Sequence, residues 1–265
     1  MDETSGDARR EIDAQPSRCS AGAALIAAFA LALSASMPVH ANVTISPIAS
    51  VITGVAGGKG QVSVIRVTSQ SPQTQYVDVS VKRIVDPATD AEHEVPVSLL
   101  EGTGLVASPA KFVLAGGATR LVRVVSLGRP TVETAYRVYF RPVAAPEGVR
   151  DADAASDSDL THDVQVSFVW GALVRVAPEK AAPGLARSED NLSVRNTGNV
   201  RAHVRAIGRC EGEAGRECDW LDVGRSVYPG QTQPIPDALR HAPVRIQYLV
   251  DGEADAQVVD LPLAP

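Results

Sequence analysis

Apolar and polar residues alternate along most of the chain after residue 41, in short runs separated by turn residues. The clearest run is the segment 163–176, DVQVSFVWGALVRV. Its first half places apolar side chains at every second position: Val164, Val166, Phe168 and Trp170. A period of two is typical of a β-strand with one buried face. We therefore predict one long strand over the whole segment.

Similar runs recur on both sides of this segment, and helical periodicity is almost absent. The runs include VSVIRVTS, QYVDVSVKRIV, KFVLAGGATRLVRVVS and TAYRVYFRPV before the segment, and NLSVRNTGNVRAHVRAIG, APVRIQYLVD and AQVVDLPL after it. Short strands with Gly and Pro between them predict an all-β protein built of sandwiches. The Pro- and Ala-rich stretch APEKAAPG is typical of a linker. We expect two domains, 42–177 and 178–265.

The first 41 residues have the features of an export signal. An alanine-rich apolar run follows Arg18 and ends in Val39, His40 and Ala41, which matches a small-residue cleavage site. This run is too short and too close to that site to favour a membrane anchor. We predict a signal peptide over 1–41, and an exported protein without stable membrane insertion.

Charge and cysteines narrow the function further. The net charge is −6, and the chain after the signal has no basic tract, which argues against a nucleic-acid partner. Cys210 and Cys218 are an even pair in an exported chain, so we predict a disulfide between them. A metal site would need further ligands at suitable spacing, and the sequence offers none.

Patterns typical of enzymes are missing from the sequence. There is no G-x-S-x-G, and no two histidines have the H-x-x-x-H spacing. The acidic stretch DADAASDSD lacks the glycine and the closing glutamate of a calcium loop. We expect no catalysis and no cofactor.

Four segments, in order, resemble the periplasmic chaperones of the chaperone–usher pathway of pilus assembly. They are SPAKFVLAGGATRLVRV at 108–124, ETAYRVYFRPV at 133–143, VQVSFVWGALVRVAP at 164–178 and LSVRNTGNVRAHV at 192–204. The stretches ISPI, YRVYF and NTGNVRA, with the paired cysteines, are most similar to the alpha or alternate clade of that family. The resemblance covers nearly the whole chain after the signal.

The resemblance implies two immunoglobulin-like domains in an L or boomerang arrangement. It also implies a periplasmic chaperone that lends the last strand of its first domain to a fimbrial subunit lacking its own final strand. The subunit would then be delivered to an outer-membrane usher. A donor strand must offer backbone hydrogen bonds and apolar side chains on one face. Val164, Val166, Phe168 and Trp170 would supply that face.

The family also holds the subunit's C-terminal carboxylate with basic residues between the domains, and Arg175 is our match for the one on this strand. Arg175 lies five positions beyond Trp170, so a bulge or twist, for which Gly171 is a natural place, is needed if both face the subunit. The first strand, NVTISPIASVITG, carries no Lys or Arg. Arg137 on the neighbouring strand is the candidate for the second anchor.

A different alignment, made on Pro178, places Leu173 at the anchor position. Arg175 would then be structural and would pair with Glu133 across the domain junction. The sequence leaves both alternatives open.

Two other classes of protein remain as alternatives: a fimbrial structural or adhesin subunit, and a generic exported immunoglobulin-like binding module. Two domains and a full long strand favour the chaperone over a subunit. The sequence does not decide whether the free protein caps itself as a homodimer through the same strand.

Overall fold

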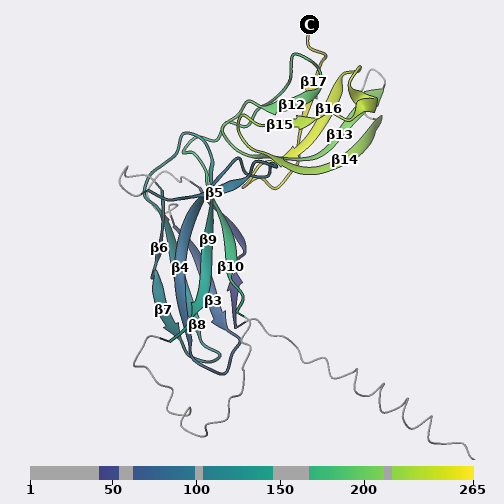
Figure 1. The fold of residues 1–265 in the computed structure, drawn as a ribbon. Helices are drawn as coiled ribbons and strands as arrows, with labels where there is room; N and C mark the ends of the chain where they lie inside the picture. Colours follow the sequence, from purple (N-terminus) through teal and green to yellow (C-terminus); the bar gives the residue numbers. More distant parts are fainter. Residues whose placement is uncertain (1–41, 54–61, 99–103, 146–166, 212–216) are drawn as a thin grey trace, which may run out of the picture. The chain divides into compact units, whose positions relative to one another are not determined.

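The computed structural model describes residues 42–53, 62–98, 104–145, 167–211 and 217–265 (Figure 1). The predicted signal peptide and the predicted donor residues Val164 and Val166 lie outside these ranges. Within them the chain forms no helix with the length and apolarity that a bilayer span requires.

Two sheets form the first sandwich, and their strands precede residue 177. One sheet has the order β1 (Val43–Ser46), β3 (Val62–Ser69), β8 (Thr119–Ser126) and β6 (Leu105–Ser108). The other has the order β2 (Ala49–Ile52), β10 (Trp170–Val176), β9 (Thr134–Val143), β4 (Gln75–Val85) and β5 (His93–Pro96), with β7 (Lys111–Leu114) also on β4. In Figure 1, β4, β9 and β10 run side by side in this sandwich.

The core of the first sandwich follows the alternation seen in the sequence. On β8, for example, Val122 and Val124 are fully buried while Leu121 and Arg123 between them are exposed. Other fully buried side chains come from both sheets: Val43, Ile65, Val67, Val138, Phe140 and Val174. Because successive side chains of a strand point to opposite faces, apolar residues at every second position are enough to form this core.

A second pair of sheets follows. One sheet contains β11 (Leu185–Arg187), β12 (Ser193–Asn196) and β15 (Thr232–Pro234). The other has the order β14 (Glu217–Val227), β13 (Ala202–Glu211), β16 (Val244–Leu249) and β17 (Gln257–Leu261), and one 3₁₀ turn, η1 (Asp237–Leu239), precedes β16. Its core is separate from the first and includes Val194, Val204, Ile207, Ile235 and Ile246. The predicted all-β fold of two immunoglobulin-like sandwiches is confirmed, while the boundary at 177/178 stays a prediction.

The predicted disulfide is present. Cys210 and Cys218 are directly opposite each other in the antiparallel pair of β13 and β14, and their sulfur atoms are bonded. The bond closes a short loop at the end of this hairpin, within the second sandwich.

We expect a Cys210→Ser/Cys218→Ser double variant to remain folded but to lose about 2–3 kcal/mol of its free energy of unfolding. The reason is that the cross-link removes conformations from the unfolded chain. Urea denaturation of the variant and the unmodified protein, followed by circular dichroism, measures this difference. Free thiols in the purified native protein would contradict the prediction, and reductant acting on the unmodified protein serves as the matched control.

Candidate functional site

Strand β10 is paired along only part of one edge. On one side it pairs antiparallel with β9 over its whole length, from Trp170 to Val176. On the other side it pairs in parallel with β2, and this pairing covers only Leu173 to Val176. Among the described residues no strand covers the edge from Trp170 to Ala172. An unpaired strand edge presents N–H and C=O groups that can accept another strand.

The two faces of β10 have different surroundings. Ala172, Val174 and Val176 are buried in the core of the first sandwich. Trp170 lies on the same side and packs against that core. Because side chains alternate along a strand, Arg175 points to the opposite face.

The bulge that we predicted at Gly171 is wrong. The register between β10 and β9 runs without a shift from Trp170 through Arg175. Gly171 has another physical role, because a Cβ atom there would lie 3.1 Å from Cδ of Arg137 and 3.3 Å from Cε1 of Tyr139. The glycine thus leaves room for two side chains from β9.

The strand is also shorter than predicted over the residues described. Residues 167–169 are described and belong to no strand, and β10 begins only at Trp170. The last residues of β9, Arg141 to Val143, pair with β4 but not with this segment. Phe168 and Val169 are therefore exposed, at 43% and 47% of their surface.

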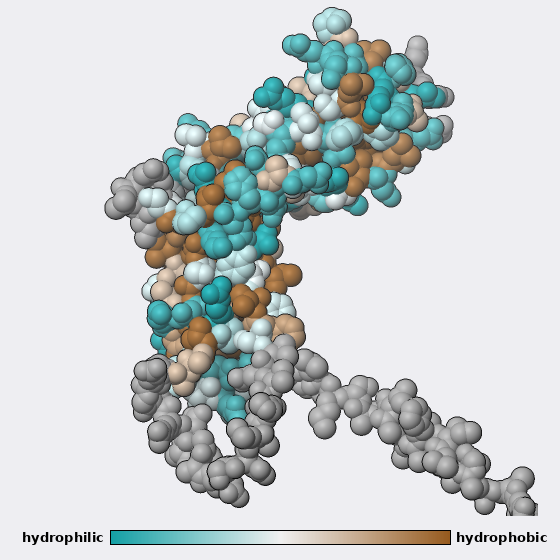
Figure 2. Space-filling view, in the orientation of Figure 1, coloured by the Kyte–Doolittle hydropathy of each residue, from teal (hydrophilic) through white to brown (hydrophobic). Residues whose placement is uncertain are grey.

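Exposure alone does not locate a binding site on this surface. Apolar patches are interspersed with polar residues on the face shown in Figure 2. Several other large apolar side chains are at least as exposed as Phe168, among them Ile48, Val113, Leu121 and Val258. Scattered exposed apolar residues are normal on soluble proteins. What sets Phe168 and Val169 apart is their position directly before an unpaired strand edge.

Arg175 lies in a buried ionic network that joins the two sandwiches. Its Nη1 and Nη2 atoms lie 2.9 Å and 3.0 Å from Oδ2 and Oδ1 of Asp251, which belongs to the turn after β16 in the second sandwich. Its Nε lies 3.9 Å from Oε1 of Glu133. Arg201 completes the network, since its Nη2 lies 2.9 Å from Oδ1 of Asp251 and its backbone N–H donates to Glu133 at 2.9 Å.

Burial dominates the electrostatics of this network. The side chain of Glu133 is only 2% exposed. Burial raises the pKa of Glu133, and the backbone hydrogen bond from Arg201 and the charge of Arg175 act in the opposite direction. Buried charges of this kind remain ionised only because opposite charges lie beside them.

Apolar and backbone contacts surround the network. Tyr228 of the second sandwich packs with Ile84 and Ala135 of the first, and Leu173 lies against them. The backbone N–H of Glu133 donates to the carbonyl of Asn199 at 2.9 Å. The two sandwiches are therefore joined by an apolar contact and a charged one.

Comparisons with known proteins identify the family. The chain is 32% identical over 225 residues to a CS1 fimbrial protein of Escherichia coli, and the match covers 82% of this chain and 90% of that protein. Among solved structures it resembles the class 5 fimbriae chaperone CfaA, with a TM-score of 0.68 and 27% identity over 84% of this chain and all of that one. The chain belongs to the fimbrial chaperones of the chaperone–usher pathway.

A second solved structure resembles this chaperone almost as well. It is described as a chaperone–tip adhesin complex of CFA/I fimbriae, and it matches with a TM-score of 0.66 and 27% identity over 85% of this chain and all of that one. No protein-family model matches the chain. The family predicted from the four sequence segments is confirmed by the structural and sequence relatives.

The contacts of Arg175 in this chaperone match the alternative in which it pairs with Glu133 across the junction. Sequence reasoning missed the nearer partner, Asp251, and also missed Arg201. Both stand at strand ends, in the stretches YLVD and NTGNVRA, which are positions where polar residues face a neighbouring domain. The carboxylate-anchor role of Arg175 stays a prediction, and these contacts do not support it.

Arg137 has a more accessible position. Its Nη2 lies 3.0 Å from Oε1 of Glu92, and its Nε lies 3.2 Å from Oε1 of Glu94. The side chain is 35% exposed, compared with 10% for Arg175. Its stem covers Gly171, at the unpaired edge of β10. A carboxylate that approached along this edge would therefore meet Arg137 first.

Proposed function

We propose that this chaperone works in the periplasm, where it caps fimbrial subunits by lending them the segment that ends in the first residues of β10. The observation that carries the proposal is the unpaired edge from Trp170 to Ala172, preceded by the exposed apolar side chains of Phe168 and Val169. The relatives support fimbrial subunits as the partners, since one is a chaperone bound to a tip adhesin. Delivery of the subunit to an outer-membrane usher is part of the same proposal.

The physical basis is strand addition. A fimbrial protein that lacks a strand exposes an apolar groove and two unpaired edges, and such a surface aggregates. The donor segment satisfies the edges with backbone hydrogen bonds, and its alternate side chains enter the groove. We assign Val164, Val166 and Phe168 to the groove, each contributing about 1.5–3 kcal/mol of burial before ordering costs. Trp170, which packs on the chaperone's own core, would hold the segment in place.

For the subunit's C-terminal carboxylate we favour Arg137 over Arg175. The guanidinium of Arg175 already binds Asp251 with two N–H groups and is buried. Arg137 lies over Gly171 on the accessible face, where an incoming carboxylate would compete with Glu92 and Glu94. A charge-assisted hydrogen bond at this point would set which subunit residue meets which donor residue.

Co-expression in the periplasm tests the proposal. We expect the co-encoded fimbrial subunit to be soluble as a one-to-one complex when it is expressed with this chaperone, and to be degraded or aggregated without the chaperone. Size-exclusion chromatography of periplasmic extracts measures both outcomes. Equal recovery of soluble subunit with and without the chaperone would refute the proposal. The same column, run on the free protein, shows whether it forms a self-capped homodimer.

A further inference from the structure

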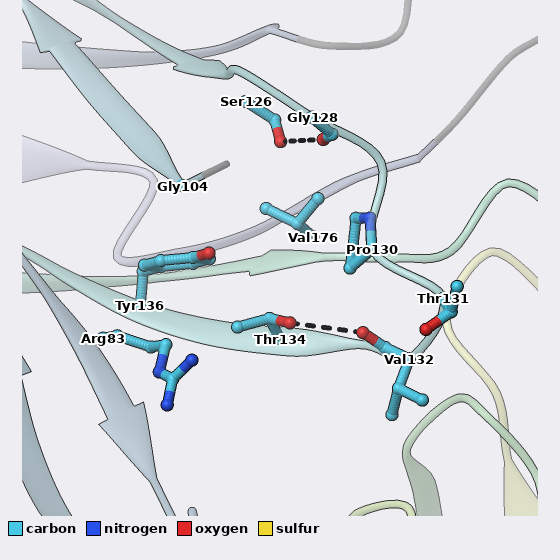
Figure 3. A pocket seen from close by; sticks show the side chains of 10 residues that line it. All are labelled: Arg83, Gly104, Ser126, Gly128, Pro130, Thr131, Val132, Thr134, Tyr136 and Val176. Atoms are coloured by element: carbon cyan, nitrogen blue, oxygen red, sulfur yellow. Dashed lines mark hydrogen bonds between the residues drawn. The ribbon is translucent and has the colours of Figure 1, made fainter. Parts of the chain in front are cut away.

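A pocket of about 280 Å³ opens at one end of the first sandwich (Figure 3). Its wall on one sheet comes from Arg83 on β4, Thr134 and Tyr136 on β9, and Val176 on β10. The opposite wall comes from Gly104, Ser126 and the connection that leads from β8 to β9. The pocket thus lies between the two sheets, where the core of the sandwich ends.

Arg83 and Tyr136 stand side by side in this pocket, because they are direct register partners on neighbouring strands. Arg83 continues the inward-facing series of Val77, Val79 and Val81 on β4, at the position where the sandwich opens to solvent. Tyr136 is only 7% exposed. In the part of the chain that the structure describes, neither the guanidinium nor the hydroxyl has a hydrogen-bond or ion-pair partner. Figure 3 shows both groups projecting from their strands without a bond to the other lining residues.

The other hydroxyls of the pocket are already used as donors. Ser126 donates to the carbonyl of Gly128 at 2.6 Å, and Thr134 donates to the carbonyl of Val132 at 3.2 Å. No carboxylate is among the lining residues. Burial raises the pKa of Tyr136 above its usual value, while the charge of Arg83 acts in the opposite direction. The pocket therefore offers one positive charge and one protonated hydroxyl, with no negative group to match them.

We propose that this pocket binds a small carboxylate, held by the guanidinium of Arg83 and the hydroxyl of Tyr136. A planar guanidinium matches the two oxygens of a carboxylate, and one cation balances its single negative charge. A largely buried hydroxyl without a partner is costly, so an acceptor at this point is favourable. The apolar side chains of Pro130, Val132 and Val176 would contact a short carbon chain.

This site is distinct from the proposed anchor for the subunit. Tyr136 and Arg137 are consecutive on β9, so their side chains point to opposite faces of the sheet. Tyr136 lies inside the sandwich, and Arg137 lies outside over Gly171. The carboxylate could come from a free small acid or from the end of a peptide, and the experiment below separates these sources.

A titration with sodium acetate at constant ionic strength, followed by amide NMR shifts, tests the pocket. We expect saturable shifts at Gly104, Gly128 and Thr134. Arg83→Gln should weaken acetate binding by about 10-fold or more, because it removes a charge-assisted bond. Tyr136→Phe, which removes only the hydroxyl, should weaken it by several-fold. Arg137→Gln is the matched control and should leave the acetate affinity unchanged. This arm does not depend on the chaperone function.

A second arm uses a peptide from the C-terminus of the co-encoded subunit, as free acid and as amide, and it rests on the proposed function. Binding of the acid that is weakened by Arg83→Gln assigns the pocket to a peptide end. Binding weakened only by Arg137→Gln leaves the pocket to a free small acid. The proposal is overturned if acetate gives no saturable shifts, if Arg83→Gln binds it equally well, or if inorganic phosphate binds more tightly than acetate through Arg83.

Discussion

A Phe168→Asp variant is expected to fold normally and to lose its fimbrial subunit. Phe168 is 43% exposed and lies before the first residue of β10, so a charge there is solvated in the free chaperone. In the complex that we propose, the same position enters an apolar groove of the subunit. A carboxylate buried there without a partner is strongly unfavourable. We expect the affinity for the subunit to fall on the order of 100-fold or more.

Two neighbouring positions provide matched controls for this experiment. Val169→Asp places the same charge at a residue of similar exposure, but strand alternation directs it away from the groove, so binding should be affected much less. Val174→Asp places it in a fully buried core position and should unfold the first sandwich. Circular dichroism of each isolated variant, with a subunit pull-down, separates these outcomes. An unfolded Phe168→Asp variant would show that Phe168 belongs to the chaperone's own core.

An Arg175→Ala variant is expected to lower the free energy of unfolding of the free chaperone by about 3–5 kcal/mol. Removing one partner of a buried ion pair leaves the others charged and unpaired. Here Glu133 would lose the nearby charge of Arg175, and Asp251 would keep only Arg201. Thermal and urea denaturation of the free protein measures the loss.

Arg137→Ala is the matched control, because Arg137 is an arginine on the adjacent strand with a more exposed side chain. Its exposed ion pairs should contribute only about 0–1 kcal/mol to stability. Affinity for the subunit should nevertheless weaken in Arg137→Ala if that residue holds the carboxylate. The opposite pattern, with Arg175→Ala stable but unable to bind the subunit, would return Arg175 to the anchor role.

Several features of this chaperone follow from the sequence because they depend on local pattern. Alternating valines on β8 and β9 specify strands with one buried face, and the same alternation repeated along the chain specifies sandwiches. The pairing of Cys210 with Cys218 follows from their being an even, nearby pair in an exported chain. Four short segments in the correct order were enough for the family.

Other features depend on which strands become neighbours, and local pattern carries no information about that. The start of β10 at Trp170 is decided by where its pairing with β9 ends, although the apolar alternation continues further upstream. Arg175 binds Asp251, which is 76 residues away in the sequence and belongs to the other sandwich.

The same reason applies to Arg83 and Tyr136, which meet only because the register of β4 against β9 places them opposite each other. A shift of one residue in that register would turn one of the two side chains to the other face of the sheet. The sequence by itself thus determined the strands, the two sandwiches, the disulfide and the family. The tertiary structure decided which edge is unpaired, which charges are buried together and which donors face the pocket, because each of these is a contact between residues far apart in the chain.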